Sequence, residues 1–367
     1  MQRALDLAHQ ALWLTSPNPR VGCVITAADG TVLGEGRTQR AGGPHAEIMA
    51  LRDAAARGHS VQGATAWVTL EPCAHQGRTG PCCDALAAAG LGRVVSAMTD
   101  PNPKVAGQGM ARLGAAGVHT ETLAPTSDEA MQARELNIGF FSRMERGLPW
   151  VRMKMAASLD GQTALQNGQS QWITSAPART DGHAWRARAC AILTGIGTVL
   201  EDDPLLNVRG VDAPRQPHLV VVDSRLDMPL NAQLLDTQGT GDQARQIWIY
   251  TATTEHLDKR AALTARGVTV IDCPGPSGKV DLGAMLRDLA RREINELHVE
   301  AGHKLNGSFI REGLVDEFLV YLAPQLLGPG QGLANLPVLT ALSDSVKLAF
   351  HAVDRIGPDL RLLLRRA

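Results

Sequence analysis

Apolar and polar positions in the first 150 residues follow helical and strand periods in turn. Apolar residues recur at helical spacing over residues 2–14, and a polar, proline-rich loop at residues 16–19 ends that pattern. Two apolar runs, 21–27 and 31–37, flank a tight hairpin signal. The other expected elements are helices at 46–57, 81–89, 110–116 and 129–146 and strands at 68–70, 94–98 and 118–121. This alternation predicts a three-layer α/β domain.

The second half repeats the alternation of strands and helices. We expect strands at 150–156, 190–194, 218–222, 246–250, 268–271, 297–300 and 317–322, and helices at 184–188, 256–265 and 284–292. Residues 346–353 and 360–364 predict an antiparallel ending. The stop signal Gly147-Leu148-Pro149 separates the halves, so we predict domains at residues 1–146 and 147–367.

Length, charge and composition narrow the class of protein. The chain has 367 residues, and single cores stop growing at about 250–300 residues, so two domains are expected. A net charge of −1 and 4% aromatic residues argue against a nucleic-acid binder and favour a small-molecule substrate. No leader-like segment or long apolar run is present, and the six cysteines suit reduced thiols. We therefore expect a cytoplasmic protein with no membrane partner.

Three potential metal ligands and one carboxylate occur in short motifs between residues 45 and 82. His45-Ala46-Glu47 is followed by Glu71-Pro72-Cys73 and then by Pro81-Cys82. One histidine and two cysteines leave a fourth zinc position for water, whose pKa the metal lowers to about 7. An HxE motif and a later PC motif, each opening a helix, are typical of zinc nucleobase deaminases, in which the glutamate moves protons and does not bind the metal. Alternatively, His45 is an ordinary helix-start residue and the cysteines are buried small hydrophobes.

The spacing between the two cysteines departs from that of the nucleic-acid and cytidine deaminases. Those enzymes use C-x-x-C, whereas Cys73 and Cys82 are nine positions apart. The inserted loop carries His75 and Arg78, and an arginine fork suits a substrate phosphate. A solvated loop without a partner is the other interpretation.

Longer stretches of the chain resemble a known family. The first-half stretches are Pro17-Asn18-Pro19-Arg20-Val21-Gly22-Cys23, Gly43-Pro44-His45-Ala46-Glu47, Val68-Thr69-Leu70-Glu71-Pro72-Cys73, Gly80-Pro81-Cys82-Cys83-Asp84 and Asp100-Pro101-Asn102-Pro103. Those of the second half are Lys154-Met155-Ala156-Ala157-Ser158-Leu159-Asp160-Gly161, Ser170-Gln171-Trp172-Ile173-Thr174, Thr198-Val199-Leu200-Glu201-Asp202-Asp203-Pro204, Val222-Asp223-Ser224-Arg225 and Val299-Glu300-Ala301-Gly302. Together they make the chain similar to the bifunctional riboflavin-biosynthesis deaminase–reductases. The resemblance implies a cytidine-deaminase-like domain followed by a dihydrofolate-reductase-like α/β domain.

For the first half, the resemblance implies a Zn²⁺ site and a deamination. His45, Cys73 and Cys82 would bind zinc, and Glu47 would be the catalytic residue. Cys83 would then be a packing residue, a choice that the spacing alone leaves open. The implied substrate is a diaminopyrimidinone ribosyl phosphate, which loses its 2-amino group. Further contacts implied for the base, the ribose phosphate or the loop geometry are Asn18, His75, Arg78, Asp100 and Asn102.

For the second half, the resemblance implies reduction of the ribosyl side chain to ribityl by NADPH. No GxGxxG motif follows a strand, so the cofactor is implied by the resemblance alone. The implied cofactor residues are Ala156, Trp172, Thr198, Asp202, Ser224 and Gly302, and the implied substrate residues are Ser170, Arg186, Leu206, Arg209 and Glu300. Ser224 with Arg225 is a candidate for selecting the 2′-phosphate, and Lys154 has either an electrostatic or a structural role. Taken singly, Trp172 also fits a core position and Arg186 a solvated helix face. The family also implies a homo-oligomer.

Three alternatives stay open at this stage. The second half could be a binding module without activity, which deletion of residues 147–367 and an assay of NADPH oxidation would distinguish. An RNA-editing deaminase would be retained on immobilised RNA. A non-enzymatic zinc-stabilised fold would unfold without metal and tolerate Glu47→Ala.

Overall fold

The chain folds into two compact units with separate sheets and cores. The computed structural model describes residues 1–74, 80–103, 105–237 and 244–367. The units are Met1–Gly147 and Leu148–Ala367, and each has a hydrophobic core of its own. Among the described residues, no helix combines the length and the apolarity needed to cross a membrane.

The first unit is built on a five-stranded sheet with the order β2-β1-β3-β4-β5. Its strands are β1 (Gly22–Thr26), β2 (Val32–Arg37), β3 (Thr65–Val68), β4 (Arg93–Ser96) and β5 (His119–Thr122). β1 is antiparallel to β2 and β3, whereas β3, β4 and β5 run parallel. The segments that follow β3 and β4 therefore leave the sheet at the same edge, and they carry the Glu71-Pro72-Cys73 and Asp100 motifs.

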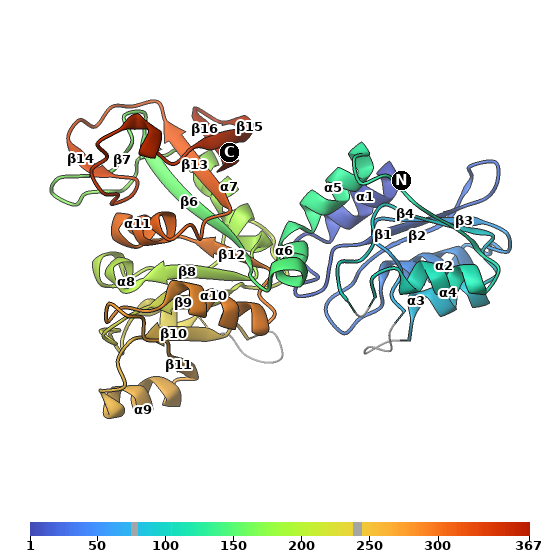
Figure 1. The fold of residues 1–367 in the computed structure, drawn as a ribbon, viewed down its shortest axis with the longest axis horizontal. Helices are drawn as coiled ribbons and strands as arrows, with labels where there is room; N and C mark the ends of the chain where they lie inside the picture. Colours follow the sequence, from blue (N-terminus) through green and yellow to red (C-terminus); the bar gives the residue numbers. More distant parts are fainter. Residues whose placement is uncertain (75–79, 104, 238–243) are drawn as a thin grey trace. The chain divides into compact units, whose positions relative to one another are not determined.

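Helices cover both faces of this sheet (Figure 1). The helices are α1 (Gln2–Gln10), α2 (Ala46–Ala56), α3 (Cys82–Ala88), α4 (Gln108–Ala115), α5 (Asp128–Leu136) and α6 (Ile138–Arg146). Positions 22 and 36 point to opposite faces, because Gly36 pairs with Cys23, the neighbour of Gly22. A Cβ at Gly22 would lie 1.9 Å from the carbonyl oxygen of Ala4 in α1, and one at Gly36 would lie 2.5 Å from the amide nitrogen of Ala50 in α2. Glycine thus allows α1 and α2 to pack closely on the two faces of a three-layer unit.

The second unit contains a nine-stranded mixed sheet with the order β11-β10-β9-β8-β12-β6-β13-β16-β15. The strands are β6 (Trp150–Ser158), β8 (Ala191–Gly195), β9 (His218–Val222), β10 (Ile247–Thr251), β11 (Val268–Asp272), β12 (Glu296–Val299), β13 (Glu317–Ala323), β15 (Leu348–Ile356) and β16 (Asp359–Arg366). All neighbours from β11 to β13 are parallel, and β16 is antiparallel to β13 and β15. A small sheet pairs β7 (Gln162–Leu165) with β14 (Gly330–Gly332).

Three of the parallel strands of this sheet are buried along their whole length. Every residue of β8, β10 and β12 is buried, as expected for a parallel sheet covered on both faces. The helices of the unit are α7 (Ala176–Arg188), α8 (Ile196–Asp202), α9 (Leu257–Ala265), α10 (Leu282–Arg291) and α11 (His303–Arg311), and short 3₁₀ helices occur at Gln233–Asp236 and Leu342–Asp344.

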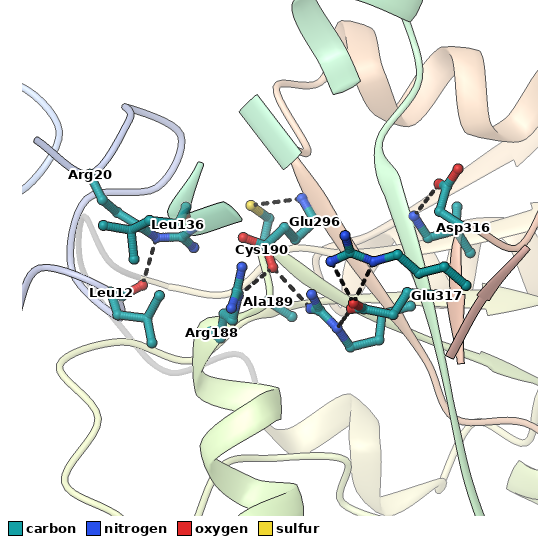
Figure 2. Close-up of polar contacts among 12 residues, drawn as sticks. Leu12, Arg20, Leu136, Arg188, Ala189, Cys190, Glu296, Asp316 and Glu317 are labelled. Carbon is teal, nitrogen blue, oxygen red and sulfur yellow. Dashed lines mark hydrogen bonds and ion pairs between the residues drawn. The ribbon is translucent and has the colours of Figure 1, made fainter. Parts of the chain in front are cut away.

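A buried ion network joins α7 to the middle of the sheet (Figure 2). Arg152 donates from Nε to Glu317 at 2.5 Å and from Nη1 to Glu296 at 2.9 Å. Arg188, the last residue of α7, donates from Nε to the same oxygen of Glu296 at 2.7 Å. Side chains of Arg152, Glu296 and Glu317 are at most 2% exposed. Removing one partner of such a network costs about 3–5 kcal/mol, so α7 is firmly attached at its end.

Most expected elements are present, with a few corrections. The strand expected at 68–70 lies earlier, at Thr65–Val68, because its residues pair with β1 and β4 and the chain then bends toward Glu71. The helix expected at 129–146 is two helices that meet at Asn137, and α7 begins at Ala176, well before 184. Residues 11–14 form turns and do not continue α1. Four short or glycine-containing elements, β7, β14, α8 and α11, were not predicted, because their patterns span too few residues to show a clear period.

Candidate active sites

Three predicted metal ligands converge in the first unit. His45 is the N-cap residue of α2, Cys82 is the first residue of α3, and Cys73 lies in the segment after β3. The Nδ1 atom of His45 lies 3.6 Å from Cys73 Sγ and 3.4 Å from Cys82 Sγ, and the three ligand atoms lie within 4.8 Å of one another. Tetrahedral zinc with ordinary bond lengths would hold nitrogen and sulfur ligands ~3.6 Å apart. The observed separations therefore fit zinc.

The electrostatics of the two thiols also suit a cation. Hydrogen bonds from Cys82 and His45 lower the pKa of the Cys73 thiol to about 4. The hydrogen bond that the Cys82 thiol makes to Cys73, together with burial, raises the pKa of Cys82. The amide of Cys82 also donates to Cys73 Sγ at 3.4 Å. One imidazole and two sulfurs, at least one of them a thiolate, form a donor set that zinc prefers.

Glu47 lies beside these ligands and is almost completely buried. Its side chain belongs to the first turn of α2, two residues after His45, and the residue is 3% exposed. Burial raises the pKa of its carboxyl group to about 7, against the opposing charge of His45. A carboxyl group in this state can both accept and release a proton near neutral pH.

The carboxylate of Glu71 organises the neighbouring segment, a role that the sequence reading did not assign. Its two oxygens accept backbone N–H bonds from Asp100 at 3.1 Å, Gly107 at 2.8 Å, Gly109 at 2.9 Å and Met110 at 3.3 Å. Glu71 is 3% exposed, so these bonds replace its hydration. These bonds hold the start of α4 and the segment before it next to Glu71, which lies two residues before Cys73. In the sequence, the one indication of this role is that a glutamate follows a strand and stands directly before Pro72-Cys73.

The loop that carries Asn18 is held by the buried Arg20 (Figure 2). Arg20 donates from Nε to the carbonyl of Leu12 at 3.0 Å and from Nη1 to that of Leu136 at 2.8 Å. Its amide also donates to Asn137 Oδ1 at 2.7 Å. The break between α5 and α6 at Asn137 thus serves to anchor the Asn18 loop.

Of the other residues predicted to contact the base or the phosphate, Asp100 is buried and two lie outside the described part of the chain. Asp100 is 7% exposed, its Oδ1 accepts from the amide of Asn102 at 2.8 Å, and burial raises its pKa to about 7. His75 and Arg78 lie outside the described residues. Cys83, the alternative ligand, donates to Asp84 Oδ1 at 3.6 Å and is not among the three converging groups.

Predicted pocket residues of the second unit gather at the carboxyl ends of parallel strands. Ser224 follows β9, Thr198 follows β8, Glu300 and Gly302 follow β12, and Ala156 lies near the end of β6. These four strands are consecutive neighbours in the sheet, and ligands of open α/β sheets bind at this edge. A Cβ at Gly302 would lie 3.8 Å from Thr198 Oγ1, so these two positions adjoin. Gly302 is also the N-cap of α11, where backbone amides favour an anion such as a cofactor phosphate.

An ion pair between Arg186 and Glu300 forms the charged part of this site. The guanidinium of Arg186 in α7 binds Glu300 in bidentate fashion, at 2.5 Å from Nε and 2.7 Å from Nη2. Burial alone would raise the pKa of Glu300, but Arg186 holds it well below its ordinary value. Burial lowers the pKa of the nearby Lys154, opposed by the charge of Glu300. The solvated-helix interpretation of Arg186 is therefore wrong, because its side chain is only 15% exposed and paired.

Some of the residues predicted for the reductase pocket lie in another segment of the chain, and one binds a backbone amide. Ser170 and Trp172 lie in the segment between β7 and α7, and Trp172 is 65% exposed, so it is not a core residue. The guanidinium of Arg179 lies 4.4 Å from the centre of the Trp172 ring. Within the described part of the chain, no hydrogen bond or ion pair joins Ser170 or Trp172 to the other predicted residues. Ser224 Oγ accepts from the amide of Val280 at 3.1 Å, and Asp202 ends α8.

Comparisons with known proteins match both units. Residues 1–98 match the family model of the cytidine and deoxycytidylate deaminase zinc-binding region, and residues 149–362 match that of the RibD C-terminal domain. The riboflavin biosynthesis protein RibD of Escherichia coli K12 is 44% identical, over 99% of this chain and 98% of that protein. The chain belongs to the RibD family. RibD of Aquifex aeolicus is 38% identical over 100% of this chain and 97% of its own length.

Solved structures of RibD proteins agree with this membership. RibD of Acinetobacter baumannii, form 1, superposes with a TM-score of 0.89 at 39% identity and covers 100% of this chain and 97% of that one. A diaminohydroxyphosphoribosylaminopyrimidine deaminase/5-amino-6-(5-phosphoribosylamino)uracil reductase from Thermotoga maritima has a TM-score of 0.85 at 28% identity, with the same coverage.

Family membership decides the activity and the fold class. The chain is a bifunctional deaminase and reductase of riboflavin biosynthesis, with Zn²⁺ and NADPH as its cofactors. The predicted cytidine-deaminase-like domain and dihydrofolate-reductase-like domain are both confirmed. The alternatives of an RNA-editing deaminase, an inactive second half and a non-enzymatic zinc fold are set aside.

Proposed function

We propose that residues 1–146 deaminate 2,5-diamino-6-ribosylamino-4(3H)-pyrimidinone 5′-phosphate and that residues 147–367 reduce the product. In this proposal His45, Cys73 and Cys82 hold zinc, which the separations of their ligand atoms support. When bound, zinc makes water a nucleophile at neutral pH. Asn18 and Asp100 lie in the two segments that Arg20 and Glu71 anchor, which supports their role in holding the substrate.

Glu47 moves the protons of the deamination. One of its carboxylate oxygens takes a proton from the attacking water and passes it to the amine that leaves the 2-position of the ring. The same group then acts first as base and afterwards as acid, which requires a pKa near the working pH. The burial of Glu47 beside the three proposed zinc ligands supports this assignment.

The second unit binds NADPH and the deaminated pyrimidine at the carboxyl edge of its sheet. When bound, NADPH would supply a hydride to the carbon of the C=N bond that the ring-opened ribosylamino group presents, and the nitrogen would take up a proton from water, giving the ribityl side chain. The proposed cofactor contacts are Ala156, Trp172, Thr198, Asp202, Ser224 and Gly302. The proposed substrate contacts are Ser170, Arg186, Leu206, Arg209 and Glu300. The adjacency of Thr198 and Gly302 and the paired Arg186–Glu300 side chains support a single pocket here.

The observation that carries the proposal is the convergence of His45, Cys73 and Cys82 beside the buried Glu47. The test is to incubate the purified chain with the diaminopyrimidinone ribosyl phosphate, with and without NADPH, and to follow ammonia and NADPH absorbance together. Ammonia should appear without NADPH, and absorbance should fall only after deamination. If ammonia appears but NADPH is never consumed, the second unit does not catalyse the proposed reduction.

We also propose that the chain forms a homo-oligomer through the edge strand β15. This strand ends the nine-stranded sheet and exposes Leu348, Phe350 and Val353. An exposed apolar edge strand is a template for pairing, and a two-fold axis lets two copies pair edge to edge. Light scattering should show a dimer or larger species that Phe350→Lys dissociates. A monomeric parent chain would contradict the proposal.

Two further predictions rest on the sequence alone. Absence of nucleic-acid binding follows from the net charge of −1, and retention on immobilised RNA would contradict it. Cytoplasmic localisation follows from the pattern of cysteines, and cell fractionation would test it.

A further inference from the structure

The segment Leu206–Arg209 has no place in a helix or strand, yet side chains bind its backbone at each of its four residues. It lies between the end of α8 and the start of β9. Its first residue, Leu206, is 4% exposed and has a φ of 45°, a left-handed conformation that costs roughly 1–3 kcal/mol and persists only where surrounding contacts enforce it.

Two arginines bind the first half of the segment. Arg245 donates from Nη2 to the carbonyl of Leu206 at 2.9 Å, and it is itself 2% exposed. Arg186 donates from Nη1 to the carbonyl of Asn207 at 3.0 Å, while its other two nitrogens bind Glu300. The segment is thereby tied directly to the charged part of the reductase site.

Gln216 binds both backbone polar groups of Val208. Its Nε2 donates to the carbonyl at 3.0 Å, and its Oε1 accepts from the amide at 2.7 Å. A single amide side chain thus replaces the two ladder bonds that a neighbouring strand would supply.

His183 binds the last residue of the segment. It lies in α7, one turn before Arg186, and its Nδ1 accepts a hydrogen bond from the amide of Arg209 at 3.4 Å. Accepting at Nδ1 requires a neutral ring that carries its proton on Nε2. Burial, followed by the charges of Arg186 and Arg209, lowers the pKa of His183 to about 4, so the ring is neutral at physiological pH.

We propose that His183 and Gln216 are positioning residues of the reductase, which hold the Leu206–Arg209 segment in the conformation that receives the phosphate-bearing pyrimidine. This inference rests on the proposed substrate contacts of Leu206 and Arg209. No strand among the described residues pairs with this segment. Without these side chains its backbone would sample many conformations, and the substrate would have to order it on binding.

The test measures both reactions of the full-length chain. His183→Ala and Gln216→Ala should each raise the reductase KM for the deaminated pyrimidine ribosyl phosphate by about tenfold or more, and leave the KM for NADPH and the deamination rate unchanged. His183→Asn offers an acceptor near the position of Nδ1 and should recover most of the loss. Thr180→Ala, at an exposed position of the same helix, is the matched control and should change nothing.

Arg209→Ala separates this inference from the proposed function. If Arg209→Ala leaves the KM for the pyrimidine unchanged, the proposed substrate contact itself fails. If it raises that KM while His183→Ala and Gln216→Ala do not, the positioning role is overturned. Equal increases in the KM for NADPH and for the pyrimidine, with no recovery in His183→Asn, would show a merely structural role. Should His183→Ala fail to fold, His183→Asn and Gln216→Ala decide the question.

Discussion

The two active sites of this chain are built in different ways. In the first unit, three ligands and one carboxyl group come from two helix starts and one strand end, all within residues 45–82. In the second unit, the proposed pocket draws on residues 156 to 302. Some of them lie at the ends of four neighbouring parallel strands, and others lie in α7 and in segments between helices and strands. The first site brings metal ligands and a proton-transfer group together, whereas the second distributes the proposed binding side chains over several elements.

This difference follows from the chemistry of each reaction. Hydrolytic deamination needs a metal and a proton-transfer group supplied by the protein, and few residue types can serve. In reduction, the cofactor carries the reactive hydride and the protein supplies binding and orientation. Substitutions in the first unit should therefore abolish a reaction, while those in the second should mostly weaken binding.

The largest effect is expected from Cys82→Ser. Loss of this ligand should remove zinc from the chain and abolish deamination, while NADPH-dependent reduction of the deaminated substrate continues. Cys83→Ser is the matched control, because Cys83 is the adjacent and equally buried residue but is not among the converging groups. Metal analysis and ammonia release measure the result. Zinc loss in Cys83→Ser with retention in Cys82→Ser would reverse the assignment.

Glu47→Gln should come next, because it removes the proton-transfer group and keeps its size. We expect zinc to stay bound and the deamination rate to fall by about 10²–10⁴-fold, with reduction unchanged. Ammonia release and zinc content, measured on the same sample, test this expectation. Deamination at the parent rate would show that another group moves the protons.

Glu300→Gln should have the largest effect in the second unit. The change breaks the bidentate pair and leaves Arg186 largely buried without its counter-charge, at a cost of about 3 kcal/mol or more. We expect kcat/KM for reduction to fall by about a hundredfold while deamination continues. Asp236→Asn, which alters an exposed pair with Arg266, should leave reduction unchanged. A reductase rate in Glu300→Gln equal to that of the parent chain would contradict the proposed role of Glu300 in substrate binding.

Glu71→Gln tests the support of the deaminase site. The amide replaces a carboxylate that accepts four backbone bonds, and hydrogen bonds to charged groups contribute about 1.5–3 kcal/mol each. We expect a lower unfolding temperature of the first unit and a moderate loss of deamination. Asp84→Asn removes an exposed pair with Arg112 worth about 1 kcal/mol or less. Equal effects of the two changes would contradict the special role of Glu71.

The smallest effect is expected from Arg225→Ala. The Arg225 side chain is 83% exposed and pairs with Asp227 at 3.0 Å, next to the proposed cofactor residue Ser224. If it selects the 2′-phosphate, the preference for NADPH over NADH should fall by about tenfold, since an exposed charge pair contributes about 1 kcal/mol or less and a phosphate somewhat more. Steady-state turnover with both cofactors measures the preference. An unchanged ratio would assign the selection to other residues.

The deaminase ligands could be predicted from the sequence because their chemistry is local. His45 and Glu47 are two residues apart at a helix start, and Pro81-Cys82 opens another helix, so each motif fixes its own geometry. The alternation of strands and helices likewise identified most of the elements, since apolar periodicity reflects which face is buried. The reductase residues, in contrast, were predicted only through the resemblance, because none of them forms a local motif with a chemical meaning of its own.

The polar partners of residues far apart in the chain could be identified only from the folded structure. The alternating architecture and the zinc-ligand set could be inferred from the amino-acid sequence, because both depend on short spacings and residue type. The backbone bonds of Glu71, the pairing of Arg186 with Glu300 and the side chains that hold Leu206–Arg209 join positions far apart in the chain. Buried polar groups must find partners, but which partners they find depends on the packing of the whole unit and leaves no periodic trace in the sequence.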